Sequence, residues 1–161
     1  MRKIDRHFFQ AIKQNGNLER VKQLVEEGAN VRSNNSKAIK ICVRENLPQV
    51  LEFIISKGAD INVCDFKCLT TCIFNGYDQV FDILIEAGIN IRQNNDGLLQ
   101  WAIDYGTDHM VRKLIELGAN IESHKGAALR KAVYKKDAYK ALALLKAGAK
   151  KRELNLESLF L

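Results

Sequence analysis

The chain has 161 residues, of which 47% are hydrophobic, and its formal net charge is +6. This length and composition allow a globular fold with an ordinary buried core. They exclude a membrane-spanning helix, since no apolar run approaches the roughly 18 residues that a span needs. We also expect no secretory signal, because the start MRKIDRHFFQ is too highly charged.

Five glycines recur at an interval of thirty residues: Gly28, Gly58, Gly88, Gly118 and Gly148. They belong to the phrases LVEEGANV, IISKGADI, LIEAGINI, LIELGANI and LLKAGAKK. A fixed period of this size predicts an array of stacked repeats. Glycine at the end of each phrase predicts a helix that terminates in the left-handed conformation. Arrays of this kind present extended surfaces to partners and rarely enclose a catalytic pocket.

Each thirty-residue unit predicts two short helices, and we place the units at 5–33, 34–63, 64–93, 94–123 and 124–153. In the third unit a first helix is ended by the turn Asn75-Gly76. The polar residues expected to cap the first helices are Asn34, Asn35 and Ser36, then Asp65, then Asn95 and Asp96. The apolar stripes of the second helices are Val21, Leu24 and Val25; Val50, Leu51, Ile54 and Ile55; Val80, Phe81, Leu84 and Ile85; Met110, Val111, Leu114 and Ile115; and Ala141, Leu144 and Leu145. The prediction is an all-α solenoid that forms a single domain over residues 1–161.

The phrases NGNLERVKQLVEEGANV, NGYDQVFDILIEAGINI and YGTDHMVRKLIELGANI resemble ankyrin repeats. The resemblance covers about residues 8 to 153, nearly the whole chain. It implies a non-catalytic module that binds another protein through its concave face, made of the fingers and the exposed side of the first helices. No cofactor and no catalytic residue is expected.

The chain departs from the ankyrin pattern at the start of each first helix. Where the family has T-P-L-H, this chain has SKAIK, FKCLT, DGLLQ and GAALR, and three residues are missing from the preceding loop. The resemblance therefore implies shortened β-hairpin fingers, with recognition moved toward the first helices. The thirty-residue form is similar to ankyrin repeats of giant DNA viruses of amoebae, although intracellular bacteria share the Ile-, Lys- and Asn-rich composition. The resemblance implies a host or cellular protein as the partner.

Candidate binding residues lie at the exposed end of each first helix, just before the turn. Three of these five positions carry an aromatic residue, and Trp101 lies one turn earlier in its helix. Aromatic and arginine side chains dominate binding energy at interfaces. The alternative is that some of these residues pack over a neighbouring repeat. The candidates are Arg44, Phe74, Trp101, Asp104, Tyr105, Tyr134 and Lys135.

Positive charge is concentrated near the end of the chain. From Lys125 to Arg152 there are ten Lys or Arg against one acid, Asp137, which gives +9 and leaves −3 for the rest. A solvated, solubilising surface explains this run most simply. The alternative function is binding of a nucleic acid or another anionic surface, with Tyr134 and Tyr139 interleaved for stacking. The basic patch comprises Arg130, Lys131, Lys135, Lys136 and Lys140.

All four cysteines, Cys42, Cys64, Cys68 and Cys72, lie within one stretch of the chain. A disulfide framework is not expected there, so the cysteines favour a reducing compartment, and we expect a cytoplasmic protein, in the host cytoplasm if it is viral. Cys64, Cys68 and Cys72 have metal-ligand spacing, but no histidine is near and we expect no metal site. No phosphate loop, nucleophile elbow or HExxH motif is present.

The end of the chain, LNLESLFL at 154–161, is apolar. We expect it to cover the last repeat as half a unit; the alternative is an exposed docking peptide. The chain is expected to be a monomer. Its protein partner cannot be read from residue spacing.

Overall fold

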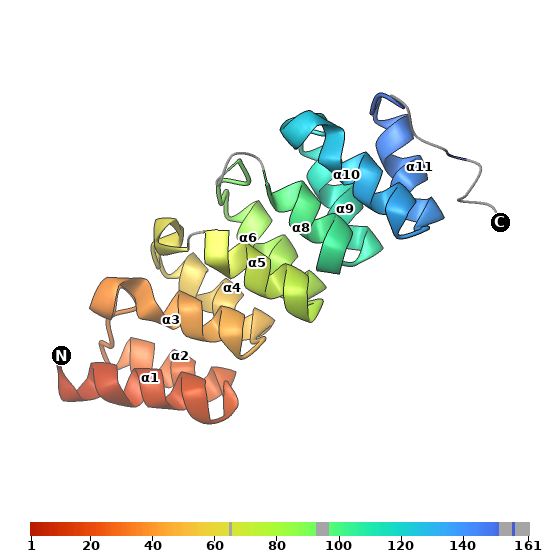
Figure 1. Cartoon of the computed structure of the whole chain (residues 1–161). Coiled ribbons are helices and arrows are strands. Elements are labelled where there is room, and N and C mark those ends of the chain that lie inside the picture. The colour runs from red at the N-terminus through yellow and green to blue at the C-terminus, as the bar shows by residue number, and fades with distance from the viewer. Residues whose placement is uncertain (65, 93–96, 152–155, 157–161) are drawn as a thin grey trace. The chain divides into compact units, whose positions relative to one another are not determined.

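The computed structural model describes residues 1–64, 66–92, 97–151 and 156, apart from the side chains of Asn15 and Asn35. Within these residues all regular structure is helical, and no strand is present (Figure 1). The helices are α1 (Lys3–Asn15), α2 (Leu18–Glu26), α3 (Ser33–Arg44), α4 (Pro48–Ser56), α5 (Phe66–Asn75), α6 (Asp78–Glu86), α8 (Leu98–Tyr105), α9 (Asp108–Glu116), α10 (Ser123–Tyr134) and α11 (Ala138–Lys146), with a short 3₁₀ helix, η1 (Ile61–Val63). The all-α fold class predicted from the sequence is confirmed.

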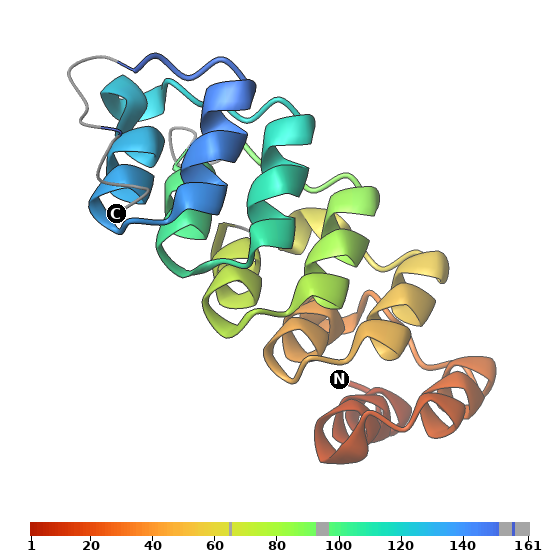
Figure 2. The same ribbon diagram turned by 90° about the vertical axis from the view of Figure 1, so that its right-hand side faces the viewer.

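The chain forms two compact units. The first comprises Met1–Thr71 and Gln79–Ile89, and the second comprises Cys72–Asp78 and Asn90–Leu161. In the first unit α1 pairs with α2 and α3 with α4, while α1 packs on α3 and α2 on α4. The second unit repeats this scheme, with pairs α8–α9 and α10–α11, and with α8 on α10 and α9 on α11 (Figure 2). First helices therefore line one side of each unit and second helices the other.

The second helix of each repeat is amphipathic because its apolar residues recur at helical spacing. These side chains form one side of the core, and the fully buried ones include Val21, Leu51, Ile54, Phe81, Leu84, Val111, Leu114, Ala141 and Leu144. Side chains cap three of these helices: Asn17, Thr107 and Asp137 accept the backbone N–H groups of Arg20, Met110 and Lys140 at 3.0, 3.2 and 3.0 Å. Pro48 occupies the first turn of α4, where its missing N–H costs nothing.

In each repeat, the second helix is terminated by the repeat glycine, whose backbone is left-handed. The φ angles of Gly28, Gly58, Gly88, Gly118 and Gly148 are 97°, 85°, 85°, 74° and 96°. The next residue donates its N–H back to the carbonyl five residues earlier, as Ala29 does to Leu24 at 2.8 Å and Ala149 to Leu144 at 3.0 Å. This is the Schellman arrangement, which satisfies helix-end carbonyls and needs a residue that tolerates positive φ. The thirty-residue interval is thus a series of helix ends.

The loops after the glycines are short turns. Backbone N–H groups two residues past the glycine are bound by side chains near the start of a first helix. The pairs are Asn30 with Asp5 at 2.9 Å, Asp60 with Ser36 at 3.0 Å, and Lys150 with Glu122 at 2.9 Å. These bonds hold three of the five loops against a first helix of the same compact unit.

The predicted capping of α3 is wrong. The helix begins at Ser33, and its N-cap, Arg32, makes no side-chain cap bond. Asn34 and Ser36 lie in the left-handed region, with φ of 53° and 48°, and the Ser36 hydroxyl binds the loop instead. The other predicted caps, Asp65, Asn95 and Asp96, lie outside the described residues, as does the segment 154–161 apart from Leu156.

The expectation that the cysteines form no disulfide is also wrong. A disulfide joins Cys64 to Cys68, whose Cα atoms lie 5.5 Å apart. Cys42 and Cys72 are free and completely buried, and this burial raises the pKa of both thiols to about 12. Because disulfides rarely persist in reducing compartments, the cysteines no longer argue for one. Among the described helices, none combines the length and hydropathy needed for a membrane span.

Candidate binding surface

Exposed hydrophobic side chains are unevenly distributed between the units. Apart from Met1, the large exposed ones that the structure describes all belong to the second unit: Phe74, Trp101, Tyr105, Leu117, Tyr134, Tyr139 and Leu142. Scattered exposed apolar residues are normal, whereas a contiguous patch marks an interaction site. The question is which of these side chains touch one another.

Three of them form a cluster around Tyr105. The ring centroid of Tyr105 lies 5.4 Å from that of Phe74 and 5.5 Å from that of Trp101. Trp101 and Tyr105 share a face of α8 because they are four residues apart. The opposite face of α8 is buried through Leu98, Leu99, Ala102 and Ile103. This aromatic cluster (Phe74, Trp101 and Tyr105) stays 63%, 40% and 53% exposed.

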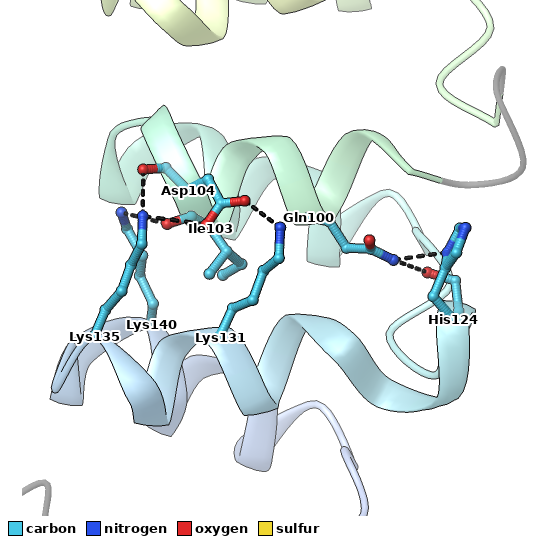
Figure 3. Close-up of polar contacts among 8 residues, drawn as sticks. Gln100, Ile103, Asp104, His124, Lys131, Lys135 and Lys140 are labelled. Carbon is cyan, nitrogen blue, oxygen red and sulfur yellow. Dashed lines mark hydrogen bonds and ion pairs between the residues drawn. The ribbon is translucent and has the colours of Figure 1, made fainter.

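A charged network joins α8 to α10 (Figure 3) and reaches the aromatic cluster through Lys135. The Asp104 carboxylate forms ion pairs with Lys131 and with Lys135, whose Nζ lies 3.1 Å from Asp104 Oδ1. Lys135 also donates to the backbone carbonyl of Asp104 at 2.7 Å, and its Nζ lies 5.6 Å from the ring centroid of Tyr105. Partial burial raises the pKa of Asp104, but the hydrogen bonds and charges of the two lysines outweigh it, so the net pKa is lowered.

A groove of about 430 Å³ runs between these groups. Its lining residues are Gly97, Gln100, Trp101, Asp104, Tyr105, His124 and Lys131. At one end Gln100 Nε2 lies 2.7 Å from His124 Nδ1 and donates to Ser123 Oγ at 3.2 Å (Figure 3). The groove therefore offers two aromatic rings, one ion-paired carboxylate, and amide and imidazole groups, which suit an apolar side chain flanked by polar groups.

The residues of the predicted basic patch differ in their surroundings, and one of them is buried. Lys140 is only 9% exposed, and its ammonium donates to the carbonyl of Gly106 at 3.0 Å and lies 3.4 Å from Asp137. There it caps the carbonyl end of α8, where a cation is favourable. Arg130 donates to the carbonyls of Lys125 and His124. Lys136 occupies the turn, with φ of 56°.

Two predicted aromatic positions lie apart from the cluster. Tyr134 is 90% exposed and makes no ring contact among the described residues. Tyr139, expected beside it, lies instead on α11 and lines a different groove with Arg112, Ile115 and Leu142. Arg44 belongs to the first unit, where its guanidinium binds the adjacent Glu45 at 2.7 Å.

Gln100 and His124 are groove residues that sequence reasoning missed. Gln100 precedes Asp104 by one helical turn, so its place on the same face could have been inferred from spacing. His124 gave no signal, because it lies in a run with Lys125 and Gly126 whose φ angles of 51°, 60° and 71° are all left-handed. Among the described residues, no three His, Cys, Asp or Glu side chains gather as metal ligands would.

No protein-family model matches this sequence, and no curated protein matches it either. Solved structures do match by shape. One of them is the crystal structure of the human ASB11 ankyrin repeat domain, with a TM-score of 0.53 and 17% identity over 98% of this chain and 89% of that one. At this identity the likeness shows the fold alone, and the chain has the fold of an ankyrin repeat domain.

Proposed function

We propose that this chain is a non-catalytic protein-interaction module that binds a cellular protein through the first-helix side of its second unit. The observation that carries the proposal is the aromatic cluster, which is exposed and contiguous and adjoins the groove along α8. Large rigid rings bury much area at little entropic cost, so they are the usual centres of binding energy. Asp104 and Lys135 flank the cluster, and Tyr134 and Arg44 are secondary candidates.

The proposal includes a monomeric chain and, following the resemblance to giant-virus repeats, a host protein as partner. It includes no compartment, because the Cys64–Cys68 disulfide removes the argument for the cytoplasm. The ankyrin-repeat fold supports a binding role, since repeat arrays present extended surfaces.

Paired variants test the proposal. The amount of partner protein captured from a host-cell lysate is measured by mass spectrometry for the wild type, for Trp101→Ala/Tyr105→Ala and for the control Tyr139→Ala. The control removes an exposed ring from another groove. We expect the double variant to lose the captured protein and the control to retain it, with unchanged helical signal in all three. Retention by the double variant would show that the aromatic cluster is not the binding centre.

The alternative is sequence-independent binding of nucleic acid or an anionic surface through the fifth repeat. It is less well supported, because Asp104 neutralises part of the charge of Lys131 and Lys135, and Lys140 is buried. Binding of oligothymidylate at low salt, with an affinity that falls continuously and steeply as the salt concentration rises, would favour this alternative.

A further inference from the structure

Charge in this chain is sorted between the two kinds of helix. The first-helix segments (2–15, 32–45, 66–75, 97–105 and 123–136) together carry a net charge of +11. The second-helix segments (18–27, 48–57, 78–87, 108–117 and 137–147) carry −3. The cations therefore follow the helices that line one side of each unit.

Among the first-helix segments of the second unit, only the α10 segment carries cations. Residues 123–136 contain Lys125, Arg130, Lys131, Lys135 and Lys136 and no acid. Asp104 is the single acid of segment 97–105, and it already neutralises part of the charge of Lys131 and Lys135. Both lysine side chains remain about two-fifths exposed, at 41% and 40%.

These lysines can still bind a partner. An ammonium has three N–H donors, and contacts to Asp104 occupy only some of them. The α8–α10 groove thus combines an aromatic wall with a rim of net positive charge. A nucleic acid fits it less well, because its phosphates recur at every nucleotide and would have to pass the Asp104 carboxylate in the groove lining, whereas a peptide can place its acidic residues beside the lysines alone.

We infer that the segment bound in this groove is an acidic stretch of a protein, with an aromatic or large aliphatic side chain placed against Trp101 and Tyr105. Its carboxylates lie near Lys131 and Lys135. Complementary charge of this kind orients a partner and excludes basic competitors. The inference rests on the proposed function and adds the chemistry of the partner to it.

The test selects phage-displayed random linear peptides on the full chain. The best binder is then synthesised together with an analogue in which every Asp and Glu becomes Asn or Gln. We expect the selected peptides to be rich in Asp and Glu around an aromatic or leucine residue. The amide analogue is expected to bind at least about tenfold more weakly. The affinity of the acidic peptide is expected to fall as the salt concentration rises.

Variants of the chain locate the effect. The double variant Lys131→Gln/Lys135→Gln is expected to bind the acidic peptide about tenfold more weakly, whereas Lys131→Arg/Lys135→Arg retains the affinity of the wild type. The control Lys13→Gln/Lys37→Gln removes the same charge from exposed positions on α1 and α3 and is expected to change binding little. Circular dichroism confirms that each variant is folded.

The outcomes separate the two proposals. If the selected peptides are neutral or basic and do not bind the Trp101→Ala variant, the acidic partner is overturned and the proposed function stands. Failure to select any peptide that depends on Trp101 would overturn both. Oligothymidylate that displaces the acidic peptide, and itself depends on Trp101 and Lys131, would replace the protein partner by a nucleic acid.

Discussion

At the scale of single residues, the turn between the two helices takes a left-handed residue in four of the five repeats, whereas Gly106 in the fourth has a φ of −82°. Gly16, Asn46, Gly76 and Lys136 occupy this turn with φ of 56°, 53°, 69° and 56°. The left-handed region costs a residue with a Cβ about 1–2 kcal/mol, and glycine pays no such cost. Lys136 is therefore the most strained of the four, since it has neither glycine's freedom nor the short polar side chain of Asn46.

Lys136→Gly is expected to raise the free energy of unfolding by about 1 kcal/mol. The reverse change, Gly76→Ala, is expected to lower the free energy of unfolding by a similar amount, because alanine is strained at positive φ. No clash adds to this cost, since the new Cβ would meet only Thr107 Cγ2 at an ordinary 3.8 Å. Urea unfolding monitored by circular dichroism measures both changes. Equal stability of all three proteins would show that the turn relaxes away from positive φ.

The cysteines provide a second prediction at this scale. Cys42 and Cys72 are buried and their pKa is raised to about 12, so almost no thiolate forms at neutral pH. In the folded, unreduced protein we expect no cysteine to react with iodoacetamide. In urea two cysteines should react, and two more only after reduction, as counted by mass spectrometry. Rapid labelling of four cysteines in the folded state would contradict the disulfide.

At the scale of helices, Asp104 links α8 to α10. Its pKa is lowered, so its contribution to stability is present above the unfolded value of 3.8 and is lost as the pH falls through the folded value. The wild type should therefore be more stable than Asp104→Asn at neutral pH. Melting temperatures from pH 7 to about pH 2 should converge in acid. A constant difference across this range would mean that Asp104 is not ionised in these ion pairs.

The helices themselves were largely predictable, because their period, apolar stripes and terminal glycines are local properties of the sequence. The position of the exposed ring pair on α8 also follows from a spacing of four residues. The fate of the basic patch did not follow, because it depends on contacts between helices about thirty residues apart. Lys140 looks like its neighbours in the sequence, yet it is buried because the carbonyl end of α8 lies within reach of its ammonium.

At the scale of the whole chain, the aromatic cluster could be placed only in part. Phe74 comes from the end of α5 and Tyr105 from the next first helix, and the repeat period brings such positions into register. The Cys64–Cys68 bond could not be foreseen from composition, since four cysteines in one stretch also suit small buried positions, as Cys42 and Cys72 show. Repeats at similar positions thus share a backbone while their side chains serve different ends.

The single tryptophan makes the cooperativity of the array measurable. Trp101 lies in the second unit, whereas Leu51, which is completely buried, lies in the first. In a repeat array each repeat interacts only with its neighbours, so a cavity destabilises the repeats around it more than distant ones. Leu51→Ala should cost about 2–5 kcal/mol in its own unit. We expect its urea transition by circular dichroism to begin well before the change in Trp101 fluorescence.

The matched variant Leu114→Ala removes an equally buried leucine from the second unit. Here the fluorescence of Trp101 should change at least as early as the circular dichroism, because the cavity lies in the unit that holds the tryptophan. The two variants share the same chemistry, so a difference between them reports position alone. If both probes coincided in both variants, the chain would unfold as one cooperative body, and the nearest-neighbour description would not apply to it.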